Sequence, residues 1–184
     1  KICLIEDFTP KTARSFEVAR STRFARGSGM PISIPVIEMI EIGAGGGSIA
    51  WVDAMARIQT GPESAASEPG PACYQRGGQR PAITDADLVL GKIDPENFAG
   101  GAIRLSLDAA QAAIARDVGD RLALTAEAAA FGICEVVDEN MANAARVHAV
   151  ERGTDIAGRT LIAFGGAAPL HAARLAEKLG IAKV

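Results

Sequence analysis

The chain has 184 residues, of which 48% are hydrophobic and 22% charged, and its formal net charge is −3. This length and apolar content suffice for one folded domain with a core, so the composition excludes a disordered chain, and no apolar run approaches the roughly 20 residues that a membrane helix needs. The acidic balance without a basic cluster argues against nucleic acid as a partner, and three widely spaced cysteines without a CxxC pair favour a reducing, cytoplasmic compartment.

Short apolar runs predict strands over residues 2–6, 16–20 and 32–42, with a glycine-containing loop over 25–30. Residues 43–101 carry most of the glycine and proline, and we expect them to form an irregular, functional insertion. A short helix near residues 84–90 fits within this insertion, with Thr84 as its N-cap.

Helical periodicity dominates the second half of the chain. It predicts a helix over residues 107–122 with Ser106 as N-cap, a longer one over 126–152 ended by Gly153, and a last one opened by Pro169 and ended by Gly180. Residues 160–164 predict a short buried strand that runs into two glycines. Strands are predicted in the first part of the chain and helices in the second, and one strand leads through two glycines into a helix. This order predicts an α/β fold.

Two glycine-rich stretches are candidate ligand sites. After the strand that ends at Ile42, backbone N–H groups of a side-chain-poor loop can converge on an anion, and this favours phosphate or carboxylate contact over a plain flexible turn. The second stretch leads into the last helix, whose free N–H groups favour a polar ligand, although tight packing explains its glycines equally well. The candidate residues are Gly43, Gly45, Gly46, Gly47 and Ser48 in the first stretch, and Gly165, Gly166 and Ala167 in the second.

Other polar residues have competing interpretations. Asp85 and Asp87 are spaced to hold Mg²⁺, but from the sequence alone carboxylates at a helix N-terminus explain them better. Cys73 as a nucleophile would need a nearby base, so a buried, inert thiol is the stronger interpretation. His148 continues an apolar stripe and is predicted to be a core histidine, whereas His171 is the better candidate to face a ligand.

In this order and spacing, several segments resemble the hydantoinase A/5-oxoprolinase family, which includes the related ATPase subunits of acetone and acetophenone carboxylases. The resemblance covers nearly the whole chain. The segments are IGAGGGSIA at 42–50, GPESA at 61–65, PGPACY at 69–74, TDADLVLG at 84–91, FGG at 164–166 and PLH at 169–171.

The resemblance implies a partial actin-like ATPase (ribonuclease H-like) lobe, with a mixed sheet and flanking helices, that binds ATP and Mg²⁺ in a cleft between two lobes. Family members carry two Asp-x-Gly-Gly-Thr phosphate motifs, and neither is in this sequence, so catalytic residues are not assigned. We expect residues 1–184 to be a fragment of one domain, the second lobe, whose first lobe belongs to the same longer chain. Residues 165–167 and His171 would lie on the adenosine side, and residues 43–48 would face the nucleotide cleft.

Two departures from the family pattern concern backbone conformation. Ala66 and Ala168 stand where the family usually has glycine, and alanine adopts a left-handed conformation less easily than glycine. Ala168 also adds a methyl group at the expected adenosine edge.

Three functions remain open at this point. The first is an ATP-dependent hydrolase of cyclic amides, of the hydantoinase/5-oxoprolinase type, which phosphorylates a carbonyl oxygen. The second is the ATPase subunit of a ketone carboxylase, and a hydantoinase B-like subunit is a possible partner in either case. The third is a non-catalytic actin-like assembly domain.

Overall fold

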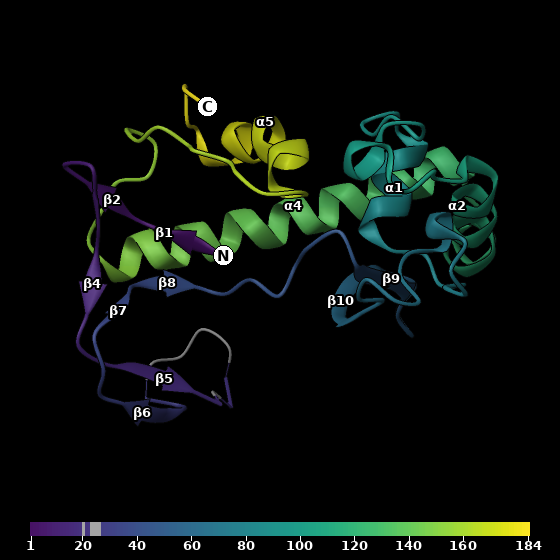
Figure 1. Cartoon of the computed structure of the whole chain (residues 1–184). Coiled ribbons are helices and arrows are strands. Elements are labelled where there is room, and N and C mark those ends of the chain that lie inside the picture. The colour runs from purple at the N-terminus through teal and green to yellow at the C-terminus, as the bar shows by residue number, and fades with distance from the viewer. Residues whose placement is uncertain (20, 23–26) are drawn as a thin grey trace. The chain divides into compact units, whose positions relative to one another are not determined.

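The computed structural model describes residues 1–19, 21–22 and 27–184 (Figure 1). They divide into two compact units, the first comprising Lys1–Ile42 and Asn143–Ile156, and the second Gly43–Ala142 and Ala157–Val184. All candidate ligand and metal residues therefore belong to unit 2. Arg20, in the predicted strand 16–20, and residues 25–26 of the predicted loop lie outside the described residues.

The described residues of unit 1 form four short antiparallel strand pairs. The predicted strand over residues 2–6 is divided at Leu4, which is buried and whose carbonyl accepts the N–H of Lys11. The predicted strand over 32–42 is likewise divided at Glu38, whose carboxylate pairs with Arg152 after the long helix. The pairs are β1 (Ile2–Cys3) with β8 (Met39–Ile40), β2 (Ile5–Glu6) with β3 (Thr9–Pro10), β4 (Thr12–Ala13) with β7 (Val36–Ile37), and β5 (Phe16–Val18) with β6 (Met30–Ile32).

Unit 2 begins with a hairpin that the sequence patterns did not predict. Strands β9 (Ser48–Val52) and β10 (Ile58–Ser64) pair antiparallel within the segment expected to be irregular. Gly61, at φ +65°, and Pro62 lie inside β10 and shift the register, and they are the residues that disguised the strand. The carboxylate of Asp53 closes the turn by accepting the backbone N–H groups of Met55 and Arg57.

Five short helical elements follow the hairpin. They are η1 (Ala72–Tyr74), α1 (Ile83–Val89), η2 (Phe98–Gly101), α2 (Leu107–Ile114) and α3 (Asp120–Leu122), with a π-helical turn over Ala115–Gly119 between the last two. Ile114 and Val118, four residues apart, lie on the same buried face across this turn. Ser106 caps α2 as predicted, since its hydroxyl accepts the N–H of Ala109.

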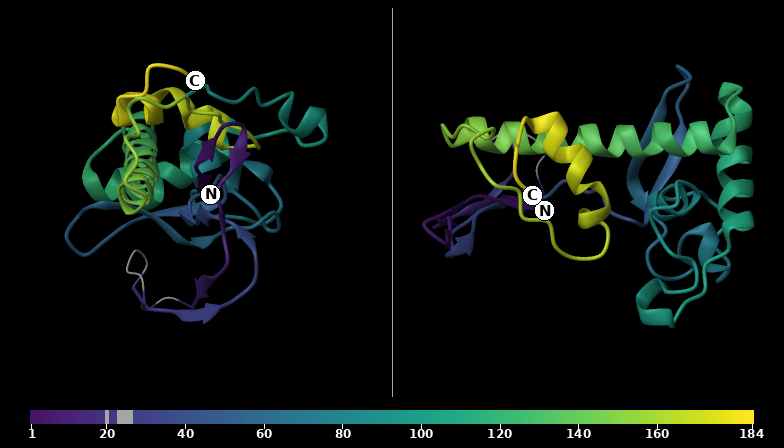
Figure 2. Two further views of the ribbon diagram at one scale, coloured as in Figure 1. Left: turned by 90° about the vertical axis from the view of Figure 1, so that its left-hand side faces the viewer. Right: turned by 90° about the horizontal axis from the view of Figure 1, so that it is seen from above.

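Helices α4 (Ala126–Glu151) and α5 (Ala168–Leu179) confirm the predicted pattern. Residues 126–142 of α4 belong to unit 2, where α5 lies beside them (Figures 1 and 2). The buried face of α5 is the predicted stripe, and Gly180 ends the helix at φ +69°. Arg174 and Lys178 of α5 bind the carboxylate of Glu135 on α4 at 2.7 and 3.1 Å.

The α/β class is confirmed, but the expected mixed sheet is not found among the described residues. All strands assigned there form two-stranded antiparallel pairs. The prediction of a buried strand over residues 160–164 is wrong, because its only ladder contact is a parallel bridge between Thr160 and Lys183, and Ile162 and Phe164 are largely exposed. In the described part of the chain no helix is both long enough and apolar enough to cross a membrane.

Candidate functional site

The glycine-rich loop over residues 43–48 is a tight turn held in place by its neighbours. The N–H of Ser48 donates to the carbonyl of Gly45, and the Ser48 hydroxyl accepts the N–H of Gly45 at 3.1 Å. The carbonyl of Gly46 accepts both the N–H and the hydroxyl of Thr84, at 2.8 and 2.9 Å. The loop is thus fixed to the first turn of α1 rather than flexible.

The second glycine stretch lies against this loop. A Cβ atom built on Gly46 would be 3.8 Å from the Cβ of Ala167, so residues far apart in sequence meet at this point. Gly165, at φ +97°, and Gly166 have open space where side chains would be, as does Gly45. The structure therefore brings the two predicted stretches together and leaves three of their glycines unobstructed.

Helix α1 joins three of the segments that the sequence singled out. Thr84 holds the glycine loop instead of capping the helix, so the predicted cap is wrong, and Ala82 occupies that position. Asp85, one residue later, is fully buried and accepts three backbone N–H groups, from Ala72, Cys73 and Ala82. Its carboxylate thereby fixes the 69–74 segment to α1. Burial outweighs these hydrogen bonds and raises the pKa of Asp85.

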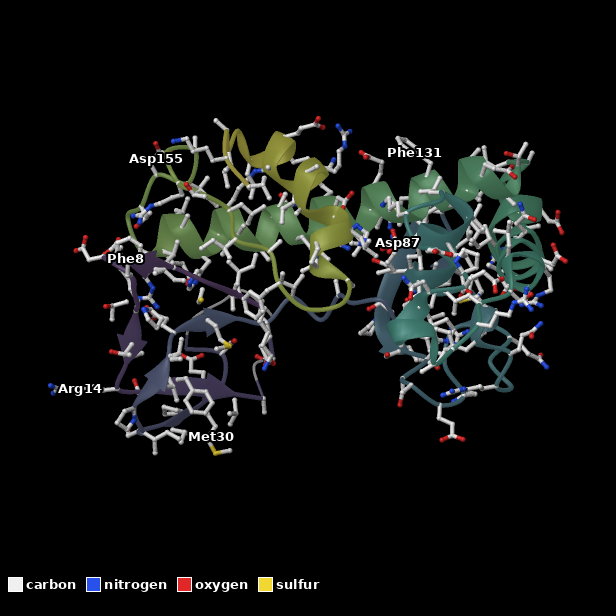
Figure 3. All side chains as sticks on the ribbon, turned by 45° about the horizontal axis from the view of Figure 1, so that its top comes forward. Phe8, Arg14, Met30, Asp87, Phe131 and Asp155 are labelled. Carbon is white, nitrogen blue, oxygen red and sulfur yellow. The ribbon has the colours of Figure 1, made fainter. Side chains whose placement is uncertain are left out.

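Asp87, on the same helix (Figure 3), contacts His171 of α5 in a buried cluster. The Nε2 atom of His171 lies 3.2 Å from Oδ2 of Asp87, close enough for an ion pair but not aligned for a hydrogen bond. On the other side of the ring, Nδ1 lies 2.8 Å from Oδ1 of Asp138 on α4. All three residues are at most 2% exposed. One imidazole thus contacts carboxylates from two other helices.

Lys92 and Cys134 complete the cluster. The Lys92 ammonium lies 3.0 Å from Oδ1 of Asp87, and the Cys134 thiol lies 3.4 Å from the same oxygen. Lys92 is partly exposed, so it links the buried charges to the surface.

The protonation states follow from these neighbours. Burial alone would lower the pKa of His171, but Asp138 and Asp87 outweigh it and raise the pKa to about 9, so the ring is charged at neutral pH. Burial alone would raise the pKa of Asp87, but His171 and Lys92 outweigh it and lower the pKa below its ordinary value. Burial, assisted by Asp87, raises the pKa of Cys134 to about 12.

The surroundings of the predicted polar site residues decide which of their expected roles the structure supports. Asp85 and Asp87 bind different partners, and among the described residues no three His, Cys, Asp or Glu side chains are arranged to hold a metal. His171 is buried between carboxylates rather than open to a ligand. The burial predicted for Cys73 is confirmed, and burial together with Asp85 raises its pKa strongly. His148 is buried as predicted.

The two departures from glycine have different consequences. Ala168 is the first residue of α5 and needs no left-handed conformation. Ala66 does adopt φ +55°, which costs an alanine about 1 kcal/mol relative to glycine. The backbone keeps the conformation that glycine would adopt more easily.

Sequence patterns missed Asp138, Lys92 and Cys134 as members of a charged cluster. A signal was present at Asp138, because it continues the buried face of α4 four residues after Cys134. A carboxylate on a buried helix face requires a partner, and His171 was one of only two histidines available.

Comparison with known proteins gives a consistent result. The family model described as hydantoinase/oxoprolinase matches residues 1–184. The alpha subunit of caprolactamase from Pseudomonas jessenii is 44% identical over 149 residues, which are 81% of this chain and 21% of that protein. The gamma subunit of acetophenone carboxylase from Aromatoleum aromaticum is 44% identical over 146 residues, 78% of this chain and 20% of that protein.

Two solved structures share the fold. The crystal structure of ATP-dependent caprolactamase from Pseudomonas jessenii has a TM-score of 0.77 at 40% identity and covers 89% of this chain and 23% of its own. A nucleotide-free structure of acetone carboxylase, from work on ATP-dependent acetone carboxylation, has a TM-score of 0.76 at 32% identity. The match covers 83% of this chain and 22% of that chain. The chain therefore spans about a fifth of the length of these relatives.

Proposed function

This chain belongs to the hydantoinase/oxoprolinase family, and on that basis we propose that it is part of an ATP-dependent hydrolase that opens a cyclic amide. The relatives include an ATP-dependent caprolactamase, and caprolactam is a cyclic amide. We also propose that unit 2 is part of the second lobe of an actin-like ATPase whose first lobe belongs to the same longer protein.

The observation that carries the proposal is the meeting of the two glycine stretches at Gly46 and Ala167. Their unobstructed positions at Gly45, Gly165 and Gly166 allow a ligand to approach the backbone closely, as phosphate and adenosine groups require. We assign residues 43–48 to the phosphate side and residues 165–167 to the adenosine side.

When bound, ATP would supply a phosphoryl group to the amide oxygen, which makes the ring carbon more electrophilic. Water would then add to this carbon, the ring C–N bond would break as the nitrogen takes a proton, and hydrolysis of the acyl phosphate so formed would release phosphate. The part of this chain is to bind and orient the nucleotide, through backbone groups of the two stretches. Ser48 contributes indirectly, because its hydroxyl holds the N–H of Gly45 and so fixes the turn.

The carboxylates of Asp85 and Asp87 already bind backbone N–H groups and the buried cluster, and among the described residues no group of three His, Cys, Asp or Glu side chains is arranged to hold a metal. The assignment of Mg²⁺ to these two residues stays a prediction, and no step here depends on it.

A second candidate is the ATPase subunit of a ketone carboxylase. A carboxylase subunit matches this chain at the same 44% identity as the caprolactamase subunit, so sequence similarity does not separate the two. Both relatives are named as single subunits, and we propose a partner of the hydantoinase B type for the full-length protein.

ATP turnover by the full-length protein separates these functions. With any such partner present, we expect 5-oxoproline, hydantoin or caprolactam to stimulate release of phosphate. Stimulation only by acetone or acetophenone with bicarbonate would favour the carboxylase. Absence of heat on titration with millimolar ATP and Mg²⁺ would instead favour an assembly domain without a working nucleotide site.

Gly166→Val tests the assignment of the second stretch. Because a Cβ atom at Gly166 would meet nothing within 4 Å, we expect the variant to fold and melt like the wild type. Its branched side chain would occupy the space assigned to the nucleotide, and we expect ATP affinity measured by calorimetry to fall at least about tenfold. Wild-type affinity in a fully folded variant would place the nucleotide elsewhere.

A further inference from the structure

His171 connects the two glycine stretches by way of α1. It lies in the first turn of α5, four residues after Ala167, and its Nε2 faces Asp87. Thr84, three residues before Asp87 on the same helix, holds the carbonyl of Gly46 through two hydrogen bonds. Residues three apart on a helix are neighbours on its surface. One short helix therefore holds the loop with one residue and α5 with another.

We propose that His171 is a positioning residue for the nucleotide, which fixes residues 165–167 against the 43–48 loop by binding Asp87 and Asp138 at once. The inference rests on the proposed function, because it assigns His171 a part in forming the ATP site. It also differs from direct ligand contact, since the ring is 1% exposed and is surrounded by its two carboxylates.

The charges of the cluster explain why an ion pair holds this junction. An apolar side chain would fill the same volume but would accept several orientations of α5, whereas carboxylates on both sides of the ring fix its position. The groups that face His171 are Asp87 from α1 and Asp138 from α4. Lys92 and Cys134 lie behind Asp87. Two carboxylates are thus balanced by one imidazolium and one ammonium.

The test is His171→Gln in the full-length protein, with ATP binding measured by calorimetry and turnover measured at saturating amide. We expect the Kd and KM for ATP to rise about tenfold, within the range of substitutions that alter coupling between sites. The KM for the amide should stay unchanged, because His171 is proposed to position only the residues that bind ATP.

Arg174→Gln is the matched control. Arg174 lies on the same helix, three residues after His171, and also binds a carboxylate of α4, but it is about half exposed. We expect wild-type affinity for ATP in this variant. An equal loss in both variants would mean that any weakening of the α4–α5 contact disturbs the site, and it would overturn the assignment to His171.

A pH series on the wild type gives a readout that does not depend on a variant. Because the pKa of His171 is about 9, ATP affinity should fall about tenfold between pH 8 and 10, and His171→Gln should abolish this step. Cys73 and Cys134 do not titrate in this range, since burial raises the pKa of each thiol well above it.

The outcomes are distinct. A wild type that binds no ATP overturns the proposed function itself. A wild type that binds ATP equally at pH 8 and 10, or a folded His171→Gln variant with wild-type Kd, overturns only the positioning role. If His171→Gln does not fold, the wild-type pH series and Asp138→Asn decide, and we expect Asp138→Asn to weaken ATP binding in the same direction.

Discussion

Gly46→Ala is the substitution for which the structure predicts the clearest effect. The added Cβ would lie 2.6 Å from the hydroxyl oxygen of Thr84, closer than any such contact in a relaxed protein. Thr84 is buried, and its β-branched side chain has few rotamers available in a helix. Either the loop moves away from α1, or Thr84 rotates and loses its hydrogen bond to Gly46.

Overpacking and the lost hydrogen bond set the expected loss of stability in Gly46→Ala. Overpacking of a buried site costs about 1–3 kcal/mol, and a lost hydrogen bond about 1 kcal/mol, so we expect a destabilisation of about 2 kcal/mol. Gly45→Ala is the matched control, because its Cβ meets nothing within 4 Å, and its effect should stay within about 0.5 kcal/mol.

A double-mutant cycle with Thr84→Ala isolates the contact. Without the hydroxyl, the atom that faces residue 46 is the Cβ of residue 84 at 4.0 Å, which is an ordinary contact. The double variant should therefore be about as stable as Thr84→Ala alone, with a coupling of about 1–2 kcal/mol.

The assay is unfolding of the full-length protein, combined with hydrogen exchange of the Thr84 amide, which donates to Gly46 at 2.8 Å. Exchange at this amide should accelerate in Gly46→Ala and not in Gly45→Ala. Equal behaviour of the two alanine variants, or additive effects in the cycle, would refute the packing of the loop against α1.

Two further predictions concern buried charges. Asp85→Asn leaves only one accepting oxygen for three backbone N–H groups, so at least one N–H loses its acceptor, and we expect a loss of about 1–3 kcal/mol in denaturant unfolding; a loss below about 1 kcal/mol would contradict this role. The pKa of His171 rises from an ordinary 6.5 to about 9, so its contribution of about 3 kcal/mol is complete below pH 6.5 and disappears as the pH rises through 9. Thermal unfolding between pH 6 and 10 should show this loss in the wild type and not in His171→Gln, and parallel curves would contradict the pKa.

The sequence predicted the helices of this protein better than its strands. Periodicity and caps located α4 and α5 within a few residues, because buried faces and terminal glycines are local signals. The β9–β10 hairpin was missed because Gly61 and Pro62 interrupt its second strand. The strand expected over residues 160–164 failed because apolar residues alone do not supply a hydrogen-bonded neighbour, and only Thr160 finds one.

Of the candidate site, the glycine stretches were predictable as backbone features, but their meeting at Ala167 depends on how distant segments pack. The charged cluster was out of reach for the same reason. Asp87 and His171 stand 84 positions apart, and neither position identifies the other as its partner. The carboxylates of Asp85 and Asp87 look alike in the sequence, yet one binds backbone and the other binds an imidazole.

Helix α1 has only seven residues, too few to be stable in isolation. Its polar residues contact partners 12, 38 and 84 positions away, so these contacts close long loops of chain. Such contacts slow folding, because chain entropy must be lost before they form. The helix and its three partner segments should therefore become ordered in one late, cooperative step, and a folding intermediate that already holds α4 would still exchange the amides of α1 freely.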